Sequence, residues 1–411
     1  MQVSLNFLII RKGGTRFSRT ITIFPIPDKM NFYIFRVIVT TVFLLCPVFV
    51  SAMDEITFRQ DGAAKTETGR ILIDATDALV FEARDSQYYI VKTENQIARK
   101  SNDVPFSYLT KREILKRLEE EFPRSRGFDI LQEEHFLIVY TTSKAFADWY
   151  GRLLKQLYSS YIAFWRGRGL QLDKLEIPMT ALIFANKEQF FRFAATDGVE
   201  RNDQMFAYYN KLTNRIVLRD FSGHETFRSG GNYRATTKDI QEFLQQTGAV
   251  FNIAAVIHEA THQIGYNCGM HERFAPYPLW LIEGMALVHE VPDRDKKGGW
   301  SIRPKVNDLR LHHLKRYLAK QPARPLQAII ENDAVLRQGE SALDNYAMAW
   351  GLTYYLITMR QKELSAYMKK LSEKTPLTED SPEIRIKEFE DAFGSDWQKL
   401  YRQCGDYLRK L

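Results

Sequence analysis

The sequence predicts an α+β protein, and three observations along its 411 residues support that prediction. Short strand-like runs dominate from Glu55 to about Asn102, strands and helices mix over the next stretch, and helical periodicity prevails from Ile240 onward. Strands and helices that occupy separate parts of a chain are typical of the α+β class. We therefore expect a β-rich module at 53–106, a mixed core at 107–300 and a mostly helical C-terminal subdomain at 301–411.

The prediction of a β-rich module is based on short apolar runs separated by Asp, Arg and Ser residues, a pattern typical of strands joined by turns. These runs are Ile71–Ile73, Ala78–Phe81 and Tyr88–Val91. In the mixed core, apolar periodicity predicts two helices and three further strand regions. The helices are Thr110–Phe122, which stops at Pro123, and the amphipathic Lys144–Trp165. The strands are Phe136–Tyr140, Met179–Ala185 and a hairpin formed by 206–209 with 214–218.

Composition excludes several classes of protein. The chain is 45% apolar and 13% aromatic with three cysteines, which excludes disordered, collagen-like and disulfide-scaffold proteins. The net charge of +7 comes mostly from residues 1–52, which hold six Lys/Arg and one acidic residue. The remaining 51 basic and 49 acidic residues leave +2 and no basic stripe, so we expect no nucleic-acid partner.

The apolar run at 37–50 predicts a signal peptide. It is shorter than the about 20 residues that a membrane-spanning helix needs. Lys29 and Arg36 precede it, and Val50-Ser51-Ala52 supplies small residues at a cleavage site before Met53. We expect 1–52 to be removed, with a true start at Met1 or near Met30, and the mature protein to be exported without a stable membrane span. The alternative is an N-terminal anchor that is not cleaved.

Export changes the interpretation of the cysteines. After cleavage only Cys268 and Cys404 remain, and an oxidising compartment would allow them to form a disulfide. They are far apart in the sequence, and two buried free thiols are an equally good interpretation.

The stretch Phe251–Gln263 carries the motif H-E-x-x-H at 258–262, within apolar helical spacing that no Gly or Pro interrupts. On a helix, side chains at i and i+4 lie on one face about 5–6 Å apart, so His258 and His262 can occupy two corners of a zinc tetrahedron. Glu259 points to the neighbouring side, where a carboxylate can take the proton from a water whose pKa zinc lowers to about 7. The alternative is a core helix with two structural histidines.

A catalytic zinc site needs a third protein ligand, and two residues compete for that role. Cys268 follows at the spacing H-E-x-x-H-x-x-G-x-x-C, which resembles the metzincin pattern with Cys in place of His. Glu283 is a lone carboxylate in the apolar stretch 278–286, and a buried carboxylate requires a cation. His271 and Glu272, in the polar connection between these helices, are expected to be solvated loop residues.

H-E-x-x-H followed by W-L-x-E-G-x-A resembles the gluzincin zinc peptidases, and it is similar to the peptidase-MA-like domain of uncharacterised exported bacterial proteins. The resemblance extends over about 128–411, and its specific part is confined to 258–290. It implies one catalytic Zn²⁺ bound by His258, His262 and Glu283, with Glu259 as the base, on a gluzincin-like mixed sheet with an active-site helix. It also makes the hairpin at 206–218 a candidate edge strand that holds an extended peptide by β-augmentation.

Two further positions follow from the same resemblance. Leu287 stands where some gluzincins carry a carboxylate behind the ligands, so Glu290 is a candidate to orient a histidine instead, unless it is a solvated helix-end residue. Tyr346 resembles the place where related gluzincins carry a catalytic tyrosine that donates to the oxyanion. His224 is not recruited by any ligand spacing.

The sequence therefore favours an exported zinc metallopeptidase that hydrolyses peptide bonds of a peptide or protein substrate. The alternative is a catalytically silent cell-envelope binding module on a peptidase-like fold. Glu259 favours the enzyme, because a domain that has abandoned catalysis often loses its base, although a shared fold alone would not establish an activity.

Overall fold

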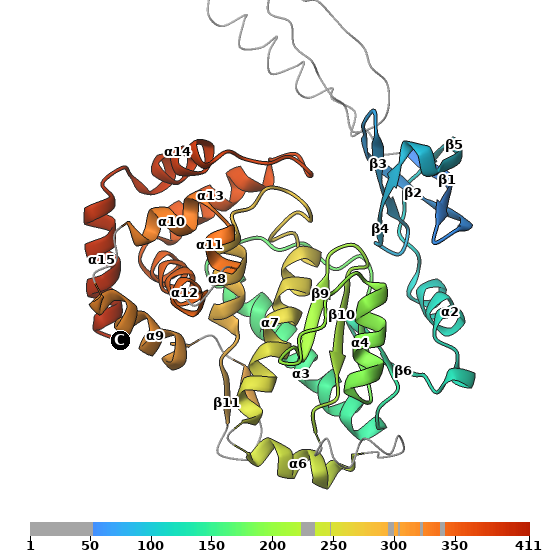
Figure 1. Cartoon of the computed structure of the whole chain (residues 1–411), viewed down its shortest axis with the longest axis horizontal. Coiled ribbons are helices and arrows are strands. Elements are labelled where there is room, and N and C mark those ends of the chain that lie inside the picture. The colour runs from blue at the N-terminus through green and yellow to red at the C-terminus, as the bar shows by residue number, and fades with distance from the viewer. Residues whose placement is uncertain are drawn as a thin grey trace, which may run out of the picture. The chain divides into compact units, whose positions relative to one another are not determined.

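The computed structural model describes residues 52–222, 235–246, 248–294, 300–302, 305–320, 324–337 and 342–411, and it divides into two compact units between Thr110 and Lys111 (Figure 1). The first unit is built of strands and the second contains a sheet followed by many helices, so the α+β prediction is confirmed. The predicted signal peptide falls almost entirely on residues outside the described ranges. Within those ranges, none of the helices has the length and apolar character needed to cross a bilayer.

The first unit is a five-stranded antiparallel sheet in the order β4-β3-β2-β1-β5. Its strands are β1 (Ala52–Gln60), β2 (Ala63–Asp74), β3 (Ala78–Ala83), β4 (Tyr88–Lys92) and β5 (Gln96–Pro105). The three predicted strand runs lie in β2, β3 and β4. One face carries a small core that includes the buried Ile56, Phe58 and Phe81.

The second unit begins with a mixed sheet in the order β6-β7-β8-β10-β9. Its central strands β7 (Phe136–Tyr140), β8 (Met179–Phe184) and β10 (Arg215–Arg219) are parallel, and every residue in them is buried, as expected for strands covered on both faces. The antiparallel strands β6 (Asp129–Gln132) and β9 (Ala207–Asn210) form the two edges. The predicted hairpin is therefore confirmed as β9–β10, with β9 at the sheet edge.

Helices connect these strands and complete the unit (Figure 1). Those around the sheet are α2 (Lys111–Glu121), α3 (Lys144–Arg166), α4 (Lys187–Thr196), α6 (Thr237–Gln245), α7 (Ala249–Asn267) and α8 (Leu279–His289). After the short strands β11 (Pro292–Arg294) and β12 (Trp300–Ile302) come α9 (Asp308–Ala319), α10 (Pro325–Glu331), α11 (Ala334–Arg337), α12 (Ala342–Met359), α13 (Gln361–Ser372), α14 (Pro382–Phe393) and α15 (Trp397–Arg409). One hydrophobic core joins the sheet to the C-terminal helices.

Helix α8 is fixed by elements far from it in the sequence. Gly284 allows α12 to approach closely, because a Cβ at this position would lie 2.1 Å from Thr353 Oγ1 and 2.8 Å from the Ala349 carbonyl oxygen. At the start of α8, the Leu279 N–H donates to Asp333 Oδ1 at 2.9 Å, and Arg385 of α14 pairs with the same carboxylate at 2.6 Å. The position of α8 thus depends on the C-terminal helices.

The two described cysteines are separate free thiols. Cys268 and Cys404 are both buried, and burial raises the pKa of each to about 12. The disulfide that we considered is not formed.

His289, at the end of α8, is a buried imidazole, and neither ring nitrogen forms a hydrogen bond with a residue that the structure describes. The rings of Tyr161, Phe164 and Trp165 surround it at centroid distances of 4.8, 5.2 and 6.0 Å. Burial lowers the pKa of His289 to about 3, and the charge of Arg168 acts in the same direction.

The burial of neutral His289 predicts that the free energy of unfolding decreases as the pH falls. A histidine of the unfolded chain has a pKa of about 6.5, so below that pH the unfolded state binds a proton that the folded state excludes. The free energy of unfolding should then decrease by up to about 1.4 kcal/mol per pH unit as the pH falls from about 6.5 toward 3. We expect His289→Phe to remove this contribution in chemical denaturation measured between pH 7 and 4.5. Phe164→Leu is the matched control, because it perturbs the same aromatic cluster without removing a titratable group. A His289→Phe slope equal to that of the unsubstituted protein would contradict the prediction.

Candidate metal centre

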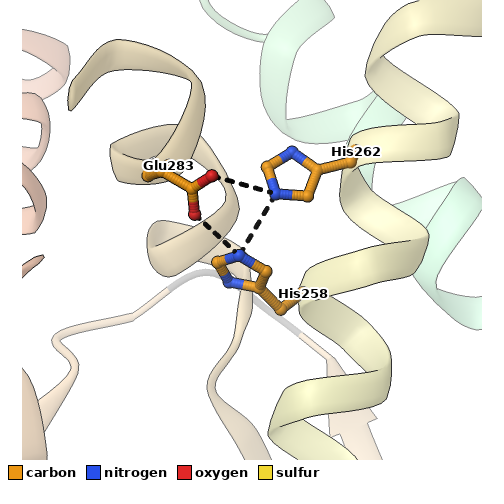
Figure 2. Close-up of side chains that lie close together, drawn as sticks. All are labelled: His258, His262 and Glu283. Atoms are coloured by element: carbon orange, nitrogen blue, oxygen red, sulfur yellow. Dashed lines mark hydrogen bonds and ion pairs between the residues drawn. The ribbon is translucent and has the colours of Figure 1, made fainter. Parts of the chain in front are cut away.

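Helix α7 presents the two motif histidines on one face. Its opposite face packs into the core through residues spaced at helical intervals, among them Ile253, Val256 and Ile264. The side chains of His258 and His262, one turn apart, lean toward α8 (Figure 2). Every residue of α8 except Glu283 is buried, and Glu283 is the lone carboxylate of this largely apolar helix, as the sequence predicted.

The three side chains converge on one small volume (Figure 2). His258 Nε2 lies 3.1 Å from His262 Nε2 and 3.0 Å from Glu283 Oε2, and His262 Nε2 lies 3.8 Å from Glu283 Oε1. Among the described residues, His258, His262 and Glu283 form the one group of three or more His, Cys, Asp or Glu side chains whose ligand atoms all lie within 4.8 Å of one another.

The pKa values of His258, His262 and Glu283 show how the protein side chains balance one another's charges. Burial acts to raise the pKa of Glu283, but the charges of His262, His258 and Lys211 outweigh it and lower that pKa to about 2. Burial lowers the pKa of His262 to about 4. For His258 the opposite holds, because hydrogen bonds to Glu283 and Glu290 outweigh burial and raise its pKa well above the ordinary value. A proton on His258 therefore supplies the positive charge that the carboxylates require.

Glu290 stands behind His258, on the side away from the cluster. Its Oε2 lies 3.1 Å from His258 Nδ1, while its Oε1 accepts from Arg310 Nε at 3.0 Å and from Asn307 Nδ2 at 3.2 Å. Its side chain is only 9% exposed, so Glu290 is not a solvated helix-end residue. This contact fixes the ring orientation of His258 and directs Nε2 at the cluster.

We expect Glu290→Gln to weaken zinc binding about tenfold, because the amide oxygen still accepts the Nδ1 hydrogen bond but lacks the charge that makes the imidazole more basic. Glu290→Ala should weaken it further, toward about 100-fold. Competition with a chromophoric chelator measures both affinities. Equal affinities in the two variants and the unsubstituted protein would show that Glu290 does not orient His258.

Glu259 lies beside the cluster and is tied to the sheet edge. Its Oε2 accepts a hydrogen bond from the Tyr209 backbone N–H of β9 at 2.8 Å. Burial raises the pKa of Glu259 to about 7, against the opposing charge of His258 and with support from the charge of Glu283. The carboxyl group thus titrates near neutral pH, as a proton-transfer group does best.

A polar network that the sequence did not reveal joins the β9–β10 hairpin to α7. Asn214 and Asn267 exchange side-chain hydrogen bonds of 2.8 Å, and the Tyr209 hydroxyl donates to Asn214 Oδ1 at 2.8 Å. The buried Gln263 donates from Nε2 to the carbonyls of Asn214 at 2.7 Å and Thr180 at 3.0 Å. The edge strand is therefore held at a fixed distance from the motif helix. No local sequence pattern predicts this network, because its hydrogen bonds join the β9–β10 hairpin and β8 to α7, which are far apart in the sequence.

The structure also shows where Cys268 and His271 lie. Cys268 ends α7, where its backbone N–H donates to the Ile264 carbonyl, and Gly269 follows with φ +71°, a helix C-terminus. Its thiol does not belong to the cluster of described metal-binding side chains. The expectation that His271 is solvated was wrong: it is buried between Tyr266 and Tyr277, at ring distances of 5.6 and 5.2 Å.

Tyr346 lies near the start of α12. Its ring centroid is 5.9 Å from the guanidinium of Arg310, the residue that binds Glu290. The structure thus links Tyr346 to the cluster through Arg310, Glu290 and His258. His224, by contrast, falls outside the described residues.

Comparison with known families adds one finding. Residues 252–378 match a family described as "Protein of unknown function (DUF1570)". This stretch begins inside α7 and ends beyond α13, so it contains the whole three-residue cluster, Glu259, Glu290 and Tyr346, while the sheet lies outside it. It covers less than half of the chain. No curated protein matches the sequence.

Proposed function

We propose that the protein is an exported zinc metallopeptidase of gluzincin type. In this proposal His258, His262 and Glu283 hold one Zn²⁺, and Glu259 is the general base in the hydrolysis of a peptide bond. The observation that carries the proposal is the convergence of two imidazoles and one carboxylate, from two separate helices, beside a second, partly buried carboxylate.

The donor set fits zinc. A tetrahedral ion with ligand bonds of about 2.0–2.1 Å separates its ligand atoms by about 3.3 Å. The three separations in the cluster, 3.1, 3.0 and 3.8 Å, bracket that value. Two nitrogen ligands and one oxygen ligand are also the set found in zinc hydrolases that leave one position open.

The side chains around the cluster supply the remaining chemistry. When bound, zinc would polarise the substrate carbonyl and make a water acidic enough to attack it near neutral pH. Glu259 would accept the proton of that attacking water and later deliver it to the leaving amine. The Tyr209 N–H holds one oxygen of this carboxylate, which keeps the base at a fixed place. We assign the oxyanion donor to Tyr346 on the resemblance alone.

The edge strand β9 supports peptide as the substrate class. Because the Arg219 N–H binds the Phe206 carbonyl, alternate residues Ala207 and Tyr209 direct their backbone groups away from β10. An extended peptide could add to this edge as a further strand. The Tyr209 N–H is already engaged by Glu259, so such a peptide would use the Tyr209 carbonyl and the backbone groups of Ala207.

Metal analysis of the purified chain, together with hydrolysis of a broad peptide library, tests the proposal. We expect about one zinc per chain, activity that a chelator removes, and recovery when zinc is returned. Zinc binding without any hydrolysis would favour the silent binding module. Absence of both would reject the enzyme and the metal centre together.

A further inference from the structure

The turn between β9 and β10 places a lysine beside the metal-ligand group. Lys211 follows the last residue of β9, and its Nζ lies 5.3 Å from the ring centroid of Tyr266. Tyr266 is one turn beyond His262 on the same face of α7, and its ring stacks on Tyr209 at 5.7 Å and 19°. The positive charge of Lys211 is close enough to act on both His262 and Glu283.

The backbone at this lysine is held from several directions. Asn210 Oδ1 accepts from the N–H groups of Leu212 and Thr213 at 2.8 and 3.2 Å. Arg273, which is buried, donates from Nη1 to the Lys211 carbonyl at 3.1 Å. Asn214, at the other end of the turn, is bound to α7 through Asn267. An ordinary surface lysine needs none of this support, whereas a lysine that must meet a ligand gains from it.

Tyr266 adds a hydroxyl donor to the same place. Its side chain is partly exposed, and its hydroxyl makes no hydrogen bond with the residues that the structure describes. Its phenol pKa is raised, first by burial and then by the charge of Glu283, so it stays protonated and able to donate. An ammonium on a supported turn and a protonated phenol on the neighbouring helix α7 are suited to a carboxylate.

Resting on the proposed peptidase function, we propose that Lys211 and the Tyr266 hydroxyl form a carboxylate-binding subsite beside the metal centre. The preferred substrate then carries a carboxylate close to the cleaved bond, from its C-terminus or from an Asp or Glu side chain. The nearby guanidinium of Arg273 adds to the positive potential, since its charge acts on both Tyr209 and Tyr266.

Matched peptides test the subsite. Pairs that differ only in Asp against Asn, Glu against Gln, or a free C-terminus against its amide are compared by kcat/KM. We expect the carboxylate form to be favoured on the order of 10- to 100-fold at one position, as for a charge-assisted hydrogen bond. Preference for the free C-terminus identifies a carboxypeptidase-type subsite, and preference for Asp or Glu identifies an acidic side-chain subsite.

Two variants assign the preference to these residues. Lys211→Gln should reduce the carboxylate-to-amide ratio to near one, and Tyr266→Phe, which keeps the stacked ring, should reduce it several-fold. Lys238→Gln is the control for charge, because this side chain is 84% exposed on α6, and its ratio should equal that of the unsubstituted protein. Hydrolysis without any carboxylate preference, or a preference that survives Lys211→Gln, would overturn the subsite and leave the peptidase proposal standing.

Binding gives a measurement that does not depend on turnover. The Glu259→Gln protein, loaded with zinc, is titrated with each peptide pair by calorimetry, with and without Lys211→Gln. We expect the carboxylate peptide to bind on the order of tenfold more tightly only when Lys211 is present. Equal binding of both peptides overturns the subsite even if the protein hydrolyses nothing. Absence of hydrolysis with Lys211-dependent carboxylate binding would instead reject the peptidase and retain the subsite.

Discussion

Replacement of Glu259 by glutamine is expected to lower kcat on the order of 10²–10⁴-fold while the zinc content stays at its original level. The carboxamide cannot accept a proton from the attacking water. It is nearly isosteric with the carboxylate, and its oxygen can still accept the Tyr209 N–H hydrogen bond that holds Oε2 at 2.8 Å. The proposed ligands His258, His262 and Glu283 are not altered, so binding of the metal should survive.

Zinc stoichiometry and steady-state kinetics of the same preparation decide this prediction. Glu242→Gln is a matched control, because it makes the same chemical change on α6 at a carboxylate that is 65% exposed. A Glu259→Gln protein that turns over at the original rate would remove the assigned base and with it the mechanism. Loss of zinc in this variant would instead mean that Glu259 supports the ligands.

Replacement of Glu283 is expected to weaken zinc binding by more than about 100-fold, beyond the effect of losing a residue behind a ligand. Its carboxylate faces both imidazoles, at 3.0 Å from His258 Nε2 and 3.8 Å from His262 Nε2, and no other residue of α8 offers a metal ligand at this point. Cys268→Ser should leave the affinity unchanged. Burial raises the pKa of this thiol to about 12, so it remains protonated at neutral pH, and a protonated thiol is a poor ligand.

Two variants, Glu283→Ala and Glu283→Gln, are needed to separate the loss of a metal ligand from a packing defect. The first removes the ligand, and the second retains a polar side chain of similar volume, so a defect shared by both is a defect in metal binding rather than in packing. Affinity is measured by competition after dialysis against a weak chelator. Full zinc retention by the Glu283 variants, with loss in Cys268→Ser, would reverse the assignment of the third ligand.

The elements that the sequence predicted are those whose signal is local. Five successive apolar residues at Phe136–Tyr140 are typical of a buried strand, and the structure has this strand as β7. The spacing of His258 and His262 places both on one face of any helix that contains them. Glu283 was recognised in the same way, because a single carboxylate in an apolar run requires an explanation inside that run.

The features that the sequence did not predict are contacts between helices and strands that are distant in the sequence. Glu290 is bound to His258 only because α8 lies alongside α7, and the same residue at a free helix end would be solvated. His271 was expected in solvent because the residues around it are polar, yet Tyr266 and Tyr277 enclose it. The hydrogen bond from Tyr209 to Glu259 joins residues 50 positions apart, and no periodicity carries that information.

The support of α8 by Asp333 and Arg385 limits how far the protein can be shortened. The family match ends at residue 378, so a fragment cut at its boundaries would keep every proposed ligand but lose Arg385 and the sheet that holds β9. Asp333 would then bind the first turn of α8 without its cationic partner. A piece that keeps this support for α8 therefore has to extend at least to Arg385, in the first turn of α14. The stretch that matches the family and the stretch that holds the proposed ligands in place are therefore not the same.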